Sequence, residues 1–267
     1  MSTSRARSMR GVLHPKVSRR HYSLTRFAPG AGLGHVVQHL WVVEWDLPEP
    51  FTAHVLPHPN VNLCAMAGRT AITGTGRRVF VQRLEGAGRV VGVTYRPGAF
   101  RLLHDAPARS LTDRELPVTA VYDVDAAALE QRLVALDVPS ALHLVDEMLR
   151  TRVPPPDVTA ALAGAIVDAA VDDRSLGRVE HVAARFDMPV WRLQRLFAEY
   201  VGVTPKWVLM RARLHDATDA VADGHPPDWA RLAAELGYCD QAHLIRSFKA
   251  AIGMTPVAYV RRSAEGA

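Results

Sequence analysis

A repeat with an offset of 51 residues near the C-terminus limits the fold of this chain more than any other feature. When residues 193–208 are shifted forward by 51 positions, they fall on residues 244–259. The identical pairs are Leu193 and Leu244, Arg195 and Arg246, Phe197 and Phe248, Gly202 and Gly253, Thr204 and Thr255, and Pro205 and Pro256. A shared order of residue types at fixed spacing indicates two copies of one small structural unit.

Each copy has the pattern of two short helices joined by a tight turn. In the first copy, residues 178–186 and 190–200 carry apolar side chains at helical spacing, and Pro189 ends the break between them. In the second copy, residues 229–237 and 242–253 repeat the pattern, with a glycine at the first turn. Two helices joined by a turn of three or four residues form a helix-turn-helix, whose second helix lies in the DNA major groove.

The second helix of each copy carries a distinct set of residues on the face opposite its apolar side. The set is Trp191, Arg192, Gln194 and Arg195 in the first copy, and Gln241, Ala242, Ile245 and Arg246 in the second. Arg and Gln side chains suit paired hydrogen bonds to guanine and adenine edges. The alternative is that Arg195 and Arg246 pair with nearby acids such as Glu199. We favour base contacts, because the same arginine recurs in both copies.

A further helix of about 16 residues is predicted between the copies, within the segment 206–224. At about 1.5 Å per residue it spans roughly 24 Å. A rigid spacer of that order would hold two recognition helices near the roughly 34 Å pitch of B-DNA, so that one chain reads two adjacent major grooves of double-stranded DNA. At the end of each copy, Gly is predicted to stop the helix, Thr to cap the next one, and Pro to occupy its first turn.

Residues 175–262 resemble the AraC/XylS family of bacterial transcription regulators. The matching segments are VAARFDMPVWRLQRLFAEYVGVTPKWV and LAAELGYCDQAHLIRSFKAAIGMTPVAYV. The resemblance implies sequence-specific DNA binding through both units and control of transcription initiation, and it adds Val190 to the first reading face. Many members have Ser where Pro189 stands, which implies that the usual side-chain cap is lost. The apolar Ala242 and Ile245 imply weaker base reading by the second unit.

The fold class predicted from the sequence is α+β. The strand-rich segment 35–102, punctuated at residues 48–50, 67–69, 74–76 and 85–88, indicates several short antiparallel strands joined by turns, in a small barrel or sandwich. Helical spacing follows, with Asp125 and Ser140 as expected caps and three prolines at 154–156 as a break and hinge. The expected divisions are a basic tail at 1–22, a sensor or dimerisation domain at 23–120, a helical connector at 121–174 and the DNA-binding domain at 175–267.

Charge is distributed unevenly along the chain, whose formal net charge is +5. Residues 1–119 carry 16 basic and 7 acidic side chains, residues 120–174 carry 4 and 10, and residues 175–267 carry 12 and 10. The first 26 residues contain Arg and Lys but no acid, which favours a solvated tail over a contact with a polyanion. The acidic connector suggests a second hypothesis, in which it masks the basic reading faces in the absence of DNA.

The front of the chain shows no arrangement that predicts catalysis. The segments LPHPNVNLCAM and GVTYRPGAFRLL resemble the N-terminal domain of a poorly characterised branch of these regulators, which implies no established ligand. Two roles are open for the aromatic residues Trp41, Trp45, Tyr95 and Phe100. They line an apolar ligand pocket or, as we favour, they belong to an ordinary hydrophobic core. His54 and His58 flank Leu56 and Pro57, a spacing that predicts no metal site. We therefore expect no enzyme activity, no cofactor and no metal.

The remaining expectations concern location and partners. No apolar stretch reaches about 18 residues, the start of the sequence lacks the apolar stretch of a secretion signal, and the two cysteines, Cys64 and Cys239, lie far apart. These features predict a cytoplasmic, nucleoid-associated protein with no membrane contact. The resemblance allows RNA polymerase, a small-molecule effector and a second copy of the chain as partners. The alternative function is an enzyme or sensor with an accessory helical module that binds DNA or protein.

Overall fold

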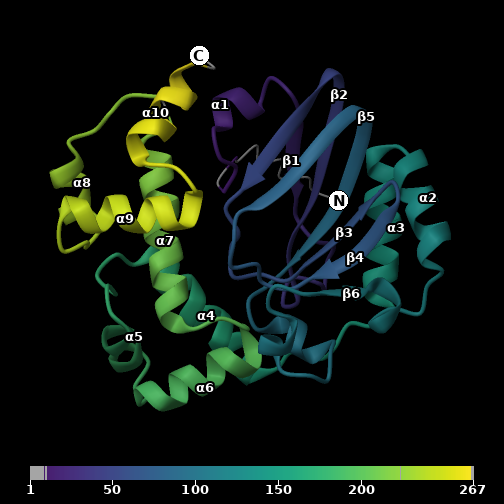
Figure 1. Ribbon diagram of the computed structural model, residues 1–267. Coiled ribbons are helices and arrows are strands. Elements are labelled where there is room, and N and C mark those ends of the chain that lie inside the picture. Colours follow the sequence, from purple (N-terminus) through teal and green to yellow (C-terminus); the bar gives the residue numbers. More distant parts are fainter. Residues whose placement is uncertain (1–8, 10, 223, 266–267) are drawn as a thin grey trace.

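The computed structural model describes residues 9, 11–222 and 224–265 (Figure 1). The front half is one antiparallel sheet in the order β1-β2-β5-β3-β4-β6. Its strands are β1 (Ser23–Phe27), β2 (Val37–Val55), β3 (Asn62–Met66), β4 (Arg69–Thr73), β5 (Phe80–Tyr95) and β6 (Glu115–Pro117). A short helix, α1 (Pro15–Ser18), precedes the sheet, and three 3₁₀ turns flank β6: η1 (Ala99–Leu102), η2 (Ala108–Leu111) and η3 (Val118–Ala120). The back half is helical, so the α+β prediction is confirmed.

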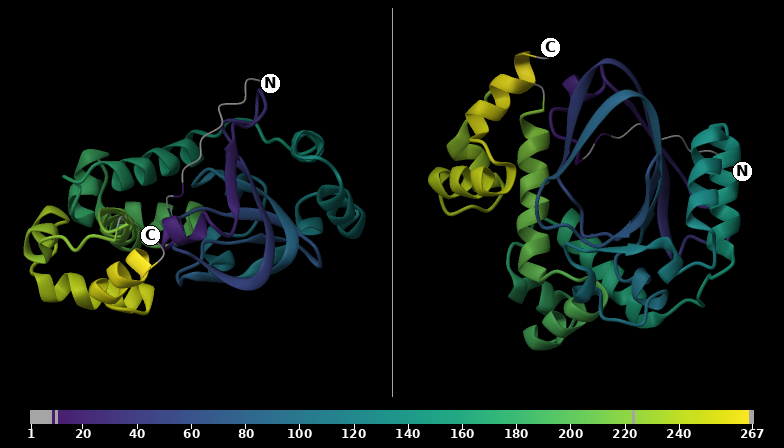
Figure 2. Two further views of the ribbon diagram at one scale, coloured as in Figure 1. Left: turned by 90° about the horizontal axis from the view of Figure 1, so that it is seen from above. Right: turned by 45° about the vertical axis from the view of Figure 1, so that its right-hand side comes forward.

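Two of the predicted turns are wrong, because β2 and β5 form one long ribbon in place of four short strands. Residues 48–50 interrupt the register of β2, where Leu47 pairs with Gly86 and Phe51 pairs with Leu84. A proline has no N–H for the ladder, so it is tolerated in a strand at such an irregularity. Figure 2 shows that both strands curve strongly along their length. The predicted turns at 67–69 and 74–76 do separate strands.

Helices α2 (Ala126–Ala135) and α3 (Val138–Arg150) cover one face of the sheet and close its hydrophobic core. The predicted cap Asp125 is confirmed, since its carboxylate accepts hydrogen bonds from two backbone N–H groups of α2. The prediction for Ser140 is wrong. The cap of α3 is Asp137, which accepts from the Ser140 backbone N–H at 2.8 Å. The helix begins earlier than expected because the proline in its first turn needs no N–H partner.

The back half is built around α7 (Pro205–Ala220). Around it lie α4 (Val158–Asp172), α5 (Val179–Arg185), α6 (Val190–Tyr200), α8 (Trp229–Glu235), α9 (Gln241–Ile252) and α10 (Pro256–Glu265). The segment 154–156 does break the chain between α3 and α4. Although we expected α4 in the connector, its Ile166 and Val167 are buried in the same hydrophobic cluster as Leu193 and Phe197 of α6. Helix α4 therefore supports the first repeated unit.

Part of the predicted basic tail is packed rather than solvated. Three of its six basic residues, Arg5, Arg7 and Arg10, lie outside the described residues. Residues 11–22, however, form α1 and a bridge to β2, with Leu13 and Tyr22 buried. The apolar side chains of this segment pack in two different hydrophobic clusters. The free energy gained by burying them outweighs the tendency of the neighbouring charged residues to keep the segment in solvent.

Candidate nucleic-acid interface

The first repeated unit consists of α5 and α6 with a turn at residues 186–189. Asp187 adopts a left-handed conformation, with φ of 49°, which short polar side chains tolerate better than others do. Pro189 is the N-cap residue of α6 and provides no side-chain hydrogen bond, as predicted. Leu193 and Phe197 are fully buried on the inner side of α6. The inner face therefore fixes the rotation of α6 about its own axis.

The second unit repeats this arrangement with α8 and α9. Gly237 has a φ of 69°, so the left-handed turn predicted there is confirmed. The carboxylate of Asp240 caps α9 by accepting the His243 backbone N–H at 2.6 Å. Leu244 and Phe248 are buried at the positions equivalent to Leu193 and Phe197. The 51-residue repeat of the sequence is thus a repeat of structure.

The predicted reading faces lie at the surface. On α6, Trp191 is 64% exposed, Arg192, Gln194 and Arg195 are also exposed, and Val190 is half-buried. On α9, Gln241, Ala242 and Arg246 are exposed, and Ile245 is half-buried. Single exposed apolar side chains are common on protein surfaces, so the exposure of Trp191 makes it available for a contact without by itself requiring one. The contacts of these residues with DNA stay a prediction.

The two repeated arginines have no ion-pair partner among the described residues. Glu199, the acid that offered an alternative partner, instead accepts a hydrogen bond from Arg101 Nε at 2.7 Å. Arg195 and Arg246 therefore extend from equivalent positions with their guanidinium donors available. Five N–H donors in a rigid fork suit carboxylate, phosphate or guanine.

Helix α7 has the 16 residues that the sequence predicts. The Thr204 hydroxyl caps it by accepting the Trp207 backbone N–H at 3.2 Å, and Pro205 occupies its first turn. Figure 1 shows α6 at the lower end of α7, reaching towards the front domain, and α9 beside the upper half of α7 on the side away from the sheet. One rigid element therefore sets the separation of the two second helices.

The front domain holds the first unit at the C-terminal end of α6. Besides the Arg101–Glu199 pair, the Thr112 hydroxyl donates to the Gly202 carbonyl oxygen at 2.6 Å. Gly202 has a φ of 92°, and a β-carbon there would lie 2.9 Å from the Ala108 carbonyl oxygen. Only glycine fits this close approach. The contact leaves the N-terminal part of α6, with its reading face, open to solvent.

The spacer helix is also tied to the front domain. Arg211 is buried, and its Nη2 donates to the Arg77 carbonyl oxygen at 2.7 Å. Its guanidinium lies over the Trp207 ring, 4.5 Å from the centroid. Burial lowers the pKa of Arg211 to about 10. This arginine therefore acts in packing rather than in DNA reading.

The segment before the sheet contacts the second unit. Leu13 and Leu56 are buried in the same cluster as Leu244, Phe248 and Tyr259. The His14 backbone N–H donates to the Tyr259 hydroxyl at 2.9 Å, and the two rings stack with centroids 4.1 Å apart. The Nδ1 atom of His14 also lies 2.8 Å from Ser263 Oγ. No spacing in the sequence signals these contacts, because about 245 residues separate the partners.

We predict that Tyr259→Phe destabilises the protein by about 1–3 kcal/mol, because it leaves the buried His14 N–H without its acceptor. The matched control is Tyr238→Phe. The Tyr238 hydroxyl is buried without a hydrogen-bond partner among the described residues, so its removal should cost nothing or stabilise. Urea unfolding of both variants measures the difference. Equal losses in the two variants would contradict the role of the Tyr259 hydroxyl.

The same contact predicts a pH dependence of stability. Burial, together with the charges of Arg262 and His54, lowers the pKa of His14 to about 4. An unfolded histidine titrates near 6.5, so between pH about 6.5 and about 4 the unfolded chain binds the proton more readily than the folded chain does. Stability from His14 is thus complete above pH 6.5 and is lost as the pH falls towards 4. His14→Asn should flatten the dependence of the urea midpoint on pH in this range, and an unchanged slope would count against it.

The four aromatic residues predicted for a pocket or a core lie in different parts of the front domain. Tyr95 and Phe100 lie in the main core, with ring centroids 5.1 Å apart. The Tyr95 hydroxyl lies 2.9 Å from that of Tyr122. Trp45 packs against another cluster, and Trp41 lies over Gly92 of β5. The structure therefore does not bring the four together, and a ligand role for them stays a prediction.

The two histidines considered for a metal site have other contacts. His54 lies on β2 with Nδ1 3.2 Å from the Thr52 carbonyl oxygen, and His58 stacks on His215 at 4.0 Å. Burial raises the pKa of the Cys64 thiol to about 12. Within the described part of the chain, no group of three or more His, Cys, Asp or Glu residues gathers as a metal site would require. No helix there has the length and apolarity needed to cross a membrane.

The hypothesis that the acidic connector masks the reading faces is wrong for α2 and α3. Both views of Figure 2 place these helices on the opposite side of the sheet from α8 and α9. Their apolar faces are committed to the core that they share with the sheet. The positions of the acidic residues on α2 and α3 therefore follow from the packing of that core and not from an attraction to the basic reading faces.

Comparison with known proteins gives two family matches. Residues 25–117 match a family described as a domain of unknown function (DUF6597), and residues 182–262 match a helix-turn-helix domain. No curated protein matches the chain. The matches point to a DNA-binding regulator rather than an enzyme.

Several solved structures are similar at low identity. A DNA-binding transcriptional dual regulator from Escherichia coli K-12 is 21% identical over 43% of this chain and 98% of its own, with a TM-score of 0.33. ToxT from Vibrio cholerae is 8% identical over 90% of this chain and 97% of its own, with a TM-score of 0.41. ToxT bound to (E)-4-(8-methylnaphthalen-1-yl)but-3-enoic acid is 10% identical over 83% and 97%, with a TM-score of 0.44.

The assignment rests on the family matches and the duplicated geometry, and the resemblance stated from the sequence is confirmed. The matched ranges cover the sheet except for the first two residues of β1, and both repeated units except for the first three residues of α5. The chain carries an AraC-type helix-turn-helix domain for DNA binding at its C-terminus and a DUF6597 domain before it.

Proposed function

We propose that the chain is a sequence-specific transcription regulator that reads two adjacent major grooves of one duplex through α6 and α9. The observation that supports this proposal best is the placement of two exposed, equivalent arginines on helices at the lower end and beside the upper half of α7. A 16-residue helix spans roughly 24 Å, which is of the order of the DNA pitch of about 34 Å.

The nine reading-face residues have different expected tasks. Arg195 and Arg246 suit bidentate contacts to guanine, and Gln194 and Gln241 suit adenine. Trp191 suits apolar contact with thymine methyl groups or sugars. The remaining four, Val190, Arg192, Ala242 and Ile245, flank these contacts. Because Ala242 and Ile245 donate no side-chain hydrogen bond, the second unit depends more on phosphate contacts, which position the protein without reading sequence.

The front domain supplies the control in this proposal. It contacts both units without covering either reading face, through Gly202 on one side and Tyr259 on the other. A small molecule that changes either contact would shift the relative orientation of the two units, and with it the population that fits both grooves. Such a regulator acts on transcription initiation, at the nucleoid in the cytoplasm.

The test is selection of duplexes bound by the full chain from a random DNA library, followed by titration of the selected duplex. We expect a recurrent motif in two parts. Specific affinity should exceed that for scrambled duplex by at least about 10³-fold at physiological salt. Enrichment of no motif, together with equal affinity for scrambled DNA, would contradict the proposal.

A further inference from the structure

Arg213 of the spacer helix α7 lies between the two helix-turn-helix units and contacts both. Its Nη2 atom donates a hydrogen bond to the Gly177 carbonyl oxygen at 2.5 Å, just before α5 begins. Its guanidinium carbon also lies 5.8 Å from the centroid of the Tyr238 ring, in the turn between α8 and α9. The arginine side chain is half-buried. One guanidinium group therefore joins the segment that enters the first unit to the turn of the second unit.

Both partners of Arg213 are fixed in the cores of their units. Leu176, the neighbour of Gly177, is buried in the same hydrophobic cluster as Leu193 of α6. Tyr238 is buried in the same cluster as Leu244 of α9. Because protein interiors are close-packed, neither partner moves without its unit.

Tyr238 also contacts the first turn of α9. Its ring meets the His243 ring edge-on, with the ring centroids 5.2 Å apart. His243 directly follows Gln241 and Ala242, two residues of the second reading face. In a helix-turn-helix, the N-terminal residues of the second helix contact base edges. The contact of Arg213 with Tyr238 therefore reaches the part of α9 that reads bases in the proposed complex.

The contact at Arg213 is tightly packed and uses the shape of an arginine. A planar guanidinium donates hydrogen bonds from its edge while its face lies on an aromatic ring. A β-carbon on Gly177 would lie 3.2 Å from Arg213 Nη2, so the backbone approaches the guanidinium closely. The cavity beside the contact measures only about 30 Å³, which leaves room for about two water molecules at most.

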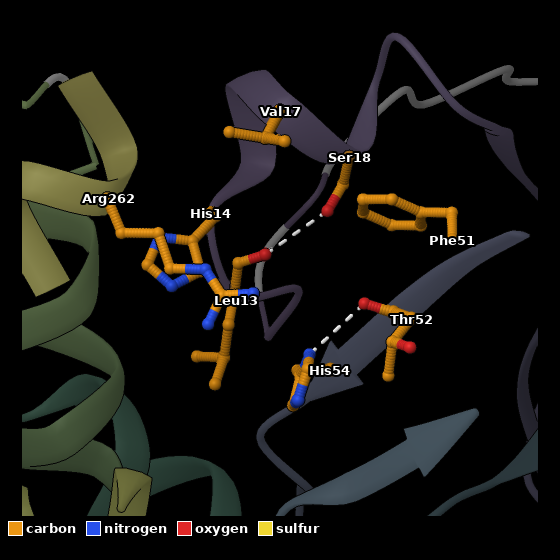
Figure 3. A pocket seen from close by; sticks show the side chains of 8 residues that line it. All are labelled: Leu13, His14, Val17, Ser18, Phe51, Thr52, His54 and Arg262. Atoms are coloured by element: carbon orange, nitrogen blue, oxygen red, sulfur yellow. Dashed lines mark hydrogen bonds between the residues drawn. The ribbon is translucent and has the colours of Figure 1, made fainter. Parts of the chain in front are cut away.

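The front domain holds the second unit less closely than Arg213 does. A cavity of about 220 Å³ lies between α1, β2 and α10. Figure 3 shows Arg262 of α10 on one side of this cavity and Phe51 of β2 on the other. Well-packed interfaces have few voids larger than a water molecule, so the larger cavity leaves α10 more freedom. The orientation of the two units relative to each other therefore depends more on Arg213 than on the contact between α10 and the front domain.

We propose that Arg213 is a positioning residue that fixes the relative orientation of the two units, and thereby determines which spacing of two half-sites the chain accepts. One base pair advances B-DNA by about 3.4 Å and turns it by about 35°. A fixed pair of reading helices fits one spacing, whereas an untied pair also fits neighbouring spacings. The link to half-site spacing rests on the function proposed above, whereas the fixed orientation of the units does not.

The DNA test uses the full chain and three duplexes. They are the selected two-part motif, the same motif with one base pair inserted between its halves, and one half of the motif alone. The wild type should lose at least about 10-fold in affinity on the insertion, because one unit then misses its bases. Arg213→Ala should lose less than about 3-fold on the insertion, because its units adopt more than one orientation. Its affinity for the half-motif should equal that of the wild type.

The effect of the insertion is the decisive quantity, because a smaller folded fraction would lower all three affinities equally. The matched control is Arg174→Ala. Arg174 lies beside the same small cavity but pairs with Asp216 of α7, at 3.2 Å. This variant should keep the preference of the wild type for one spacing. An equal insertion effect in Arg213→Ala and the wild type, or an equal loss of preference in Arg174→Ala, would overturn the proposal.

Variants of Tyr238 test the other end of the contact. Tyr238→Phe keeps the ring on which the guanidinium lies, so the preference for one spacing should remain. Tyr238→Leu removes the ring and should relax the preference as Arg213→Ala does. A preference that remains in Tyr238→Leu would contradict the role of the ring.

A measurement without DNA tests the fixed orientation directly. Spin labels at Glu180→Cys of α5 and Lys249→Cys of α9, both exposed positions, report the distance between the units in the full chain. Cys64→Ala and Cys239→Ser remove the two native thiols. Arg213→Ala should broaden the distance distribution measured by pulsed electron paramagnetic resonance. An unchanged distribution would overturn the proposal whatever the DNA result. A wild type that prefers no spacing would contradict the proposed function instead, and the distance distribution would then decide on Arg213 alone.

Discussion

Replacing both Arg195 and Arg246 by Ala is expected to weaken binding to the selected duplex by about 2–6 kcal/mol, since each arginine that reads a base contributes about 1–3 kcal/mol. The two lie on separate helices and share no partner, so their losses should add. Affinity for scrambled duplex should change much less, because it depends on phosphate contacts. Gel-shift titrations at a fixed salt concentration measure both affinities.

The matched control for this variant is Arg132→Ala. Arg132 is exposed like the reading arginines, but it lies on α2, on the far side of the sheet. Its removal should leave both affinities unchanged. If the double variant and the control lost specific affinity equally, or if the double variant lost none, the assignment of the reading faces would be wrong.

The largest loss of stability is expected for Phe197→Ala, at about 3–5 kcal/mol. Phe197 is fully buried between α6, α4 and α7, where no neighbour can fill the space of a deleted ring. Most single domains have only about 5–15 kcal/mol of stability, so this one change removes much of it. DNA affinity should fall with the folded fraction.

Trp191→Ala separates stability from reading on the same helix. Trp191 is mostly exposed, so its truncation should change the unfolding free energy by less than about 0.5 kcal/mol. It should nevertheless weaken binding to the selected duplex, because its ring faces the groove in the proposed complex. Urea unfolding and gel shift on both variants give the comparison. A stable Phe197→Ala, or a strongly destabilised Trp191→Ala, would mean that the two faces of α6 have been exchanged.

The sequence predicted the back half well because its signals are local. Each helix-turn-helix is specified by apolar spacing within about 20 residues. Gly237 at a left-handed turn of the second unit and Thr204 at the helix start after the first unit are further local signals. The length of α7 followed from the same periodicity. The repeat also strengthened these predictions, because residues that define one helix-turn-helix recur at equivalent positions in the other.

The front half was less predictable because its structure depends on partners distant in the sequence. The Pro and Gly residues at 48–50 and 85–88 read as turns when each segment is taken alone. They face each other across β2 and β5, and only that pairing makes them a bend within a long ribbon. The packing of Leu13 and His14 on α10 joins opposite ends of the chain and has no local signal at all.

Hydroxyl-radical footprinting of the full chain on the selected duplex tests the central claim most directly. The claim is that one chain places α6 and α9 in adjacent major grooves. We predict two protected patches on the same face of the duplex, with centres one helical turn of about 10 base pairs apart. Arg195→Ala should weaken one patch and Arg246→Ala the other. A single patch, or two patches on opposite faces of the duplex, would contradict the account.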